Sequence, residues 1–165
     1  MTMKITEHRF APSGGIPNHP ELPALVVADA FEYASSGDIQ ARFHANRWSG
    51  TWVWTVFDYH HFHPDAHEAL GVVSGHATLH LGGPEGETVL VRAGDLLLLP
   101  AGTGKKRQVS SEDFQVVGAY PPGQADVTTL RGDDGGDDIR DTIRAVPLPE
   151  TDPLGEDEAL LARWR

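Results

Sequence analysis

The chain contains no cysteine. This absence excludes disulfide scaffolds, thiolate zinc sites, iron–sulfur clusters and cysteine nucleophiles. With 165 residues the chain has the length of one ordinary domain, and a chain of this size buries roughly 70% of its unfolded surface. Folding therefore requires neither a disulfide nor a metal ion.

Basic residues are few, because 13 Lys and Arg stand against 24 Asp and Glu and give a net charge of -11. Such a chain repels phosphate backbones and anionic lipid headgroups, so we expect no nucleic-acid and no membrane partner. The sequence also lacks an apolar run long enough to cross a membrane, and its first residues lack the apolar stretch of a secretion signal. We therefore expect a cytoplasmic protein.

Glycine and proline are frequent instead, with 18 and 12 residues, which is typical of turn-rich β proteins. An alternation of side chains from Thr51 to His63 predicts a strand that places Trp52 and Trp54 together on one face. Two tryptophans favour a covered face, so we expect them to face the N-terminal arm or the partner chain of a homodimer. Turn signals separate further expected strands at 70–73, 76–81, 88–92, 96–99 and 114–120, a pattern typical of a sandwich or barrel.

The remaining segments are expected to surround this barrel. Proline-rich residues 5–25 predict an extended arm with little secondary structure, and residues 38–46 predict one short helix. Residues 131–138 form an acidic loop, and a helical turn is expected at 156–164. The prediction is a single domain, 1–165, with an arm and helix at 1–50, a barrel core at 51–122 and an irregular acidic C-terminal extension at 123–165.

Histidines gather in one part of the sequence. Six of the nine lie within 21 residues: His60, His61, His63, His67, His76 and His80. On a strand His61 and His63 point the same way, and Glu68 can return to the same volume after a turn. Two imidazoles and one carboxylate form a facial set that suits divalent iron, manganese, nickel or zinc. The alternative to metal binding is that His61 and His63 are hydrogen-bonded histidines packed in the core.

Two spaced motifs resemble those of the cupin superfamily. The first, His-x-His-x4-Glu-x6-Gly, is present as His61, His63, Glu68 and Gly75, and the second, Gly-x5-Pro-x-Gly-x2-His, as Gly94, Pro100 and Gly102. Further stretches resemble the YjlB-like branch of bacterial cupins, namely residues 18–23, 59–63, 67–71, 100–104, 117–123 and 146–153. The resemblance covers nearly the whole chain and implies a double-stranded β-helix, the all-β jelly roll of cupins.

The resemblance also implies a divalent metal held by His61, His63, Glu68 and a histidine at position 105, where this chain has Lys105. At about 4 Å and an effective dielectric constant of about 20, two unit charges interact by about 4 kcal/mol, so an ammonium beside a divalent ion is strongly repelled. Three outcomes remain open. Lys105 points away from a three-ligand site, lies close as a neutral base, or pairs with Glu68 and replaces the metal.

These outcomes lead to two functional hypotheses. The first is a metal-dependent dioxygenase or isomerase acting on a small molecule, with Tyr59 or Lys105 as the catalytic group that handles protons. The second is a non-catalytic ligand-binding cupin in which Lys105 replaces the fourth metal ligand. In either case, Lys105, Lys106 and Arg107 predict a basic lip at the barrel mouth that favours an anionic ligand.

The other histidines are assigned to supporting positions. His60 and His67 have the wrong parity or lie in the turn, so we expect them to support the site or face the surface. His76 and His80 alternate with Ala77, Leu79 and Leu81, so we expect both to point outward.

Overall fold

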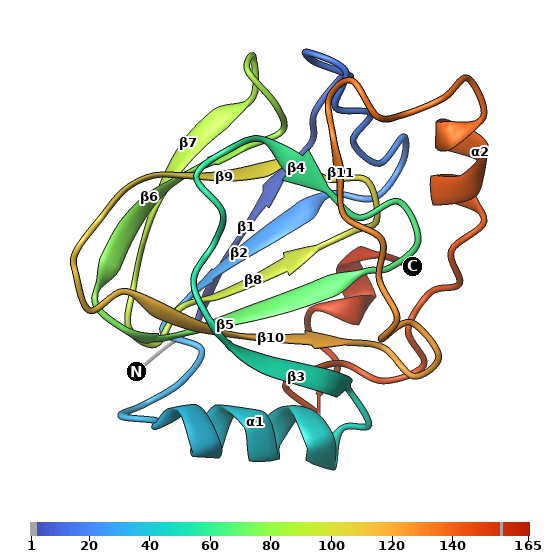
Figure 1. Cartoon of the computed structure of the whole chain (residues 1–165). Coiled ribbons are helices and arrows are strands. Elements are labelled where there is room, and N and C mark those ends of the chain that lie inside the picture. Colours follow the sequence, from blue (N-terminus) through green and yellow to red (C-terminus); the bar gives the residue numbers. More distant parts are fainter. Residues whose placement is uncertain (1–2, 156) are drawn as a thin grey trace.

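Two antiparallel sheets face each other in a computed structural model that describes residues 3–155 and 157–165 (Figure 1). Within these residues a six-stranded sheet contains, in spatial order, β1 (Lys4–His8), β2 (Ala24–Ala28), β8 (Leu96–Leu99), β5 (Glu68–Ser74), β10 (Gln115–Tyr120) and β3 (Ser49–Trp54). The facing five-stranded sheet contains β11 (Leu130–Arg131), β4 (His61–Phe62), β9 (Lys105–Ser110), β6 (His76–Leu81) and β7 (Glu87–Arg92). The predicted jelly roll is confirmed. None of the helices in the described residues is both long and apolar enough to pass through a membrane.

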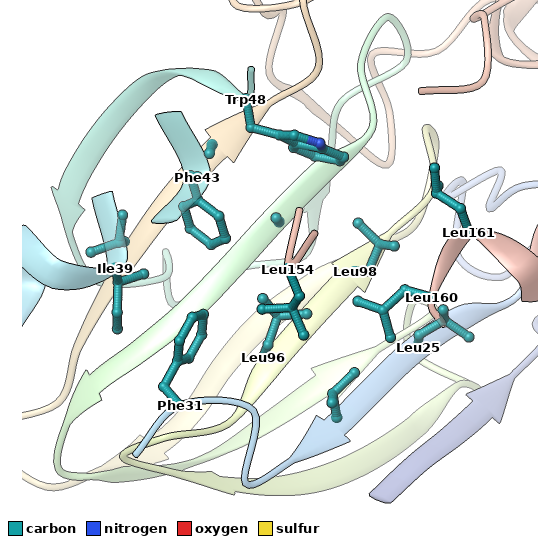
Figure 2. Packing of buried hydrophobic residues seen from close by; sticks show 14 of the residues in the cluster. Leu25, Phe31, Ile39, Phe43, Trp48, Leu96, Leu98, Leu154, Leu160 and Leu161 are labelled. Carbon is teal, nitrogen blue, oxygen red and sulfur yellow. The ribbon is translucent and has the colours of Figure 1, made fainter. Parts of the chain in front are cut away.

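Two hydrophobic clusters occupy opposite faces of the six-stranded sheet. One lies between the sheets and includes Leu70, Val72, Leu79, Leu81, Val91, Leu97 and Val116. The other lies on the outer face, where α1 (Ser36–Ala45) and the C-terminal segment cover it (Figure 2); it includes Leu25, Phe31, Ile39, Phe43, Trp48, Leu96, Leu98, Leu154, Leu160 and Leu161. The all-leucine strand β8 supplies both clusters, which explains its uninterrupted apolar sequence.

The helix expected at 38–46 is α1. Its N-cap is Ser35, whose side chain accepts a hydrogen bond from the Asp38 backbone N–H, while the Asp38 carboxylate accepts one from the Ser35 backbone N–H. This capping box fixes where the helix begins. Ile39 and Phe43, one turn apart, pack onto the outer face of the sheet.

The N-terminal arm contributes more strands than its proline content indicates. Residues 9–23 are mostly irregular, as expected, but β1 precedes them and β2 follows them, and both strands pair within the six-stranded sheet. Strand β9 (Lys105–Ser110) was not predicted, because its sequence Lys-Lys-Arg-Gln-Val-Ser carries few apolar residues. The arm therefore supplies two strands, β1 and β2, to the six-stranded sheet.

The single strand expected from Thr51 to His63 is wrong. Strand β3 ends at Trp54, residues 55–60 cross from one sheet to the other, and β4 begins at His61 (Figure 1). A crossing segment interrupts the alternation of faces, so the parity of Trp52 no longer predicts which way His61 points.

The C-terminal extension contains two elements that the sequence did not indicate. Strand β11 pairs with β4, and helix α2 (Ile139–Arg144) buries Ile143. The terminal turn is a short 3₁₀ helix, Leu161–Arg163, and the first residue of the turn expected there, Glu156, lies outside the described residues.

Candidate functional site

A cavity of about 220 Å³ is lined by residues from both sheets. Its walls are largely aromatic and aliphatic and include Trp52, Trp54, Phe57, Leu70 and Val127. Its ionisable residues come from four strands: His61 from β4, Glu68 from β5, Lys105 from β9 and Tyr120 from β10, with His63 directly after β4. An apolar cavity with a few convergent polar groups is the usual form of a small-molecule site.

Glu68 is the centre of the polar residues. Its side chain is buried, and Lys105 Nζ, also buried, lies 3.0 Å from Oε1. The Tyr120 hydroxyl donates a hydrogen bond of 2.9 Å to Oε2, and His63 Nε2 lies 3.3 Å from the same oxygen. The contact between Lys105 Nζ and Oε1 is therefore an ion pair between two buried groups.

Backbone carbonyls hold both histidines through Nδ1. His61 Nδ1 lies 2.9 Å from the Tyr59 carbonyl and His63 Nδ1 lies 3.0 Å from the Thr128 carbonyl. Because a carbonyl oxygen only accepts, each Nδ1 carries the hydrogen in this arrangement. Nε2 of His61 is then left as an acceptor on a ring that lines the cavity.

Tyr120 connects the carboxylate to the cavity wall. The Trp52 indole Nε1 donates a hydrogen bond of 2.8 Å to the Tyr120 hydroxyl, which itself donates to Glu68. Gly118 lies opposite Trp52 in the β10–β3 pair, and a Cβ at Gly118 would overlap the indole ring. The glycine therefore provides the space in which the Trp52–Tyr120–Glu68 chain forms.

Burial and neighbouring charges fix the protonation states. Burial alone would raise the pKa of Glu68, but the Lys105 ammonium and His63 outweigh it and hold this pKa well below the ordinary value. Burial and the Lys105 charge lower the pKa of His61 to about 3, so its ring is neutral at pH 7. Burial and the Glu68 carboxylate raise the pKa of Tyr120, which stays protonated and able to donate.

The predicted metal ligands do not form a metal site in the described part of the chain. His61, His63 and Glu68 all line the cavity, but no group of three or more ligand residues converges there on a point that could hold an ion. The Lys105 ammonium lies against the carboxylate that a metal would need. The donor set therefore does not fit a divalent cation, and of the three outcomes for Lys105 the observed one is pairing with Glu68.

Other residues singled out from the sequence lie elsewhere. Tyr59 does not line this cavity; its ring stacks on Phe57 with centroids 5.0 Å apart and carries the Arg131 guanidinium 3.9 Å from its centre. The basic lip does not form, because Lys106 lines a different, open hollow beside Tyr59, while Arg107 Nε donates to the Val56 carbonyl.

Four further histidines lie outside the cavity. His76 and His80 project from the outer face of β6, as expected, and the His60 ring packs edge-on against His80 with centroids 4.9 Å apart. His67 is fully buried beside Trp164, and its Nδ1 accepts a hydrogen bond from the Ala101 backbone N–H.

Three residues that line the cavity were missed or misassigned in the sequence analysis. Tyr120 was read only as the end of a strand, although it shares the parity of Val116, an interior residue of the same strand. Trp52 and Trp54 were expected to face the N-terminal arm or the partner chain of a homodimer; both line the cavity, and Trp54 is 58% exposed. Their assignment to the face opposite His61 failed because the chain crosses between sheets at 55–60.

No family model matches the chain. The uncharacterised protein YjlB of Bacillus subtilis is 36% identical over 166 residues, which cover 99% of this chain and 99% of YjlB. Among solved structures, a double-stranded β-helix protein from Klebsiella pneumoniae is similar at 20% identity and a TM-score of 0.37, over 66% of this chain and 69% of that chain. Acireductone dioxygenase from Bacillus anthracis, with a cadmium ion in its active centre, shares 23% identity at a TM-score of 0.36, over 52% and 57% of the two chains.

The solved structures are too distant to carry an argument about chemistry. The likeness to YjlB, by contrast, spans both proteins from end to end. It agrees with the two spaced motifs and with the two facing sheets. The chain therefore belongs to the YjlB-like cupins.

Proposed function

We propose that the chain is a metal-independent ligand-binding cupin, in which the barrel cavity holds a small organic molecule and the Lys105 ammonium stands where the family pattern has its fourth metal ligand. The observation that carries this proposal is the Lys105 Nζ–Glu68 Oε1 distance of 3.0 Å between two buried side chains at the cavity. The ammonium supplies to Glu68 the positive charge that a metal ion would otherwise supply.

Energetics support a binding role for this pair. Removing two charges from water costs several kcal/mol for each ion, and apolar residues of similar volume often stabilise a fold equally well. The fold therefore does not require the pair. Charged groups kept inside an apolar cavity, with strongly shifted protonation equilibria, are typical of binding and catalytic sites.

The size of the cavity limits the ligand. A dry cavity of about 150 Å³ accommodates benzene, and pockets for drug-sized ligands measure about 300–1,000 Å³. At about 220 Å³ this cavity holds one ring with a short substituent. The proposed ligand is therefore a small metabolite-sized molecule and not a nucleotide or a peptide.

A second candidate function, a metal-dependent oxygenase or isomerase, is favoured by one observation. Both histidines hold Nδ1 against a backbone carbonyl, which is also how metal-ligating histidines are oriented. In this candidate, Lys105 would have to leave Glu68 before an ion could bind, so the two candidates make opposite predictions about metal content.

Elemental analysis and thermal unfolding decide between the candidates. For the purified protein we expect substoichiometric metal and no gain in melting temperature from added iron, manganese, nickel or zinc, whereas small organic molecules from a screening set raise it. Lys105→His is expected to acquire metal, and Lys106→His, altered outside the cavity, is the matched control. One metal ion per wild-type chain, lost in His61→Ala, would instead support the metal-dependent candidate.

A further inference from the structure

The barrel cavity adjoins a second hollow on the surface of the molecule. Trp54, the last residue of β3, and Thr55, which follows it, line both the cavity and an open groove of about 510 Å³. The other residues that line the groove are Arg107, Ser110, Ser111, Glu112, Phe114 and Gln115. Because the two hollows share two wall residues, a molecule seated in the cavity has only Trp54 and Thr55 to pass before it enters the groove.

Trp54 presents a largely exposed aromatic surface at this junction. It is 58% exposed, and its indole packs against Phe57 with ring centroids 5.5 Å apart and an angle of 81° between the rings. The contact with Phe57 supports the indole on one side and leaves the rest of its surface to solvent. A large apolar side chain exposed beside a cavity is a feature of binding sites, where a ligand covers it.

Arg107 is anchored beside this junction by two hydrogen bonds to residues 55–60, the segment that crosses between the sheets. Its backbone N–H donates to the Phe57 carbonyl over 2.9 Å, and its Nε donates to the Val56 carbonyl over 3.0 Å. The Nε bond is the only hydrogen bond of its side chain to a described residue, and Arg107 forms no ion pair with any of them. The N–H donors of both Nη atoms therefore stay open to a ligand. A guanidinium held in this way matches the two oxygens of a carboxylate.

Glu112 is the acidic residue that lines the same groove. It is exposed, and within the described chain it does not pair with Arg107. A solvated carboxylate at this distance is screened by water and salt, so it weakens the attraction of an anion to Arg107 without replacing the anion. Removal of the Glu112 charge therefore tests the groove without altering Arg107.

Resting on the proposed function, we infer that the cavity ligand carries an anionic arm: its apolar ring occupies the cavity, the arm passes over Trp54, and a carboxylate at the end of the arm binds Arg107 in the groove. The preference for an anion then comes from one arginine outside the cavity and not from the basic lip that the sequence indicates. Lys105 is already paired with Glu68, and Lys106 lines another hollow.

Aromatic acids with arms of increasing length test the inference: phenylacetate, phenylpropionate and phenylvalerate, each beside the primary alcohol of the same chain length. Their affinities for the full chain can be measured by calorimetry. At the length that reaches Arg107 we expect the acid to bind about tenfold or more tightly than its alcohol, because charge-assisted hydrogen bonds are about twice as strong as neutral ones. Acetate, which has the anion without the ring, should bind about tenfold or more weakly than that acid.

Variants of the groove provide the sharper test. Arg107→Met should abolish the advantage of the acid and leave the affinity of the alcohol unchanged, whereas Arg107→Lys, which keeps the charge without the paired donors, should retain part of the advantage. Glu112→Gln should enlarge the advantage and leaves Arg107 in place even if a variant of Arg107 folds poorly. Arg92→Met is the matched control, because Arg92 is an exposed arginine of β7 that lines neither hollow.

Three results would overturn the inference. The first is equal binding of acid and alcohol at every length, and the second is an advantage of the acid that persists in Arg107→Met. The third is binding of acetate as tight as that of the best aromatic acid, which would make the groove independent of the cavity. In all three cases, binding of the alcohols leaves the proposed function standing. If neither acids nor alcohols bind, the inference also fails, and the metal analysis and ligand screen above decide the proposed function separately.

Discussion

Lys105 and Glu68 show how one substitution changes the chemistry of a barrel. A histidine at position 105 would add a neutral ligand beside the carboxylate, whereas lysine adds a fixed positive charge on a flexible stem. Both side chains are almost completely buried, with exposed fractions of 4% and 1%. Each charge depends on the other, because water reaches neither of them well.

Breaking this pair is expected to destabilise the fold. Lys105→Met leaves a buried carboxylate without its counter-charge, and we expect the free energy of unfolding to fall by about 3–5 kcal/mol, as for other broken buried pairs. E68Q/K105M should recover most of the loss, because no unpaired charge remains. Urea unfolding of the wild type, both single variants and the double variant gives the coupling directly; additive single effects would contradict the pairing.

The buried histidines predict a dependence of stability on pH. Burial, and to a lesser extent His19, lowers the pKa of His67 to about 3 from 6.5. The unfolded chain therefore binds one more proton between these pH values, and stability falls as the pH drops below 6.5, by about 1.4 kcal/mol per pH unit for each such group. His61 acts in the same direction. The lowered pKa of Glu68 adds a further loss only below its ordinary value of 4.5.

Replacing His67 separates its contribution. His67→Gln keeps an acceptor for the Ala101 N–H, and we expect the slope of unfolding free energy against pH to decrease by about 1.4 kcal/mol per unit between about pH 6 and 5. The exposed His76→Gln is the control and should leave the slope unchanged. An unaltered slope in His67→Gln would show that His67 is not held neutral.

At the scale of elements, the β10–β3 pair determines the shape of the cavity. Gly118 faces the Trp52 indole across the two strands. In Gly118→Ala the new methyl group must displace the indole, so we expect the Trp52–Tyr120 hydrogen bond to break and stability to fall by about 1–3 kcal/mol. Affinity for the cavity ligand should fall with it.

Tryptophan fluorescence and urea unfolding test this expectation together. Gly136→Ala serves as control, since nothing lies within 4 Å of a Cβ at that position. An unchanged emission spectrum with unchanged stability in Gly118→Ala would contradict the close packing of Trp52 on β10.

Helices and strands with a regular hydrophobic pattern could be predicted from the sequence, whereas the course of the chain between them could not. The helix, the hairpin strands and β8 follow from periodicity and turn residues. The crossing at 55–60 could not be predicted, because its residues keep alternating while the backbone changes sheet. Strand β9 carries charged residues, so its sequence does not indicate a strand of the barrel. One of them, Lys105, is buried because it pairs with Glu68 on the facing sheet. Long-range pairing of this kind leaves no local pattern in a sequence.

The candidate site was predictable in its ligand-like residues and not in its chemistry. His61, His63 and Glu68 follow from motif spacing and do line one cavity. The partner that decides their charge, Lys105, lies 37 positions after Glu68 and was left with three open outcomes. Tyr120 and Trp52 join them only through tertiary hydrogen bonds.

For the whole molecule, the C-terminal segment completes the outer hydrophobic cluster. Trp164 is 4% exposed, packs in that cluster, and donates a hydrogen bond of 2.9 Å from Nε1 to the Pro23 carbonyl. The segment thereby connects the last turn of the chain to the end of the N-terminal arm. Stability of the whole fold should depend on it.

Trp164→Ala is expected to lower the free energy of unfolding by about 3–5 kcal/mol, because it leaves a large cavity in the outer cluster. For a chain of this length the melting temperature should fall by roughly 10 °C. The exposed Leu148→Ala is the control and should change little. A loss below about 1 kcal/mol in Trp164→Ala would mean that the segment is not needed for the folded core.

The cavity is assembled across the gap between two layers: Glu68 and Tyr120 belong to the six-stranded sheet, and His61 and Lys105 to the five-stranded one. A folding intermediate in which only one sheet has formed would carry two of these four cavity residues and would not yet enclose a cavity. In a refolding experiment, therefore, the capacity to bind ligand should arise with the final docking of the layers, later than strand formation within either one. Ligand binding in this barrel is thus a kinetic marker for the completion of the native state.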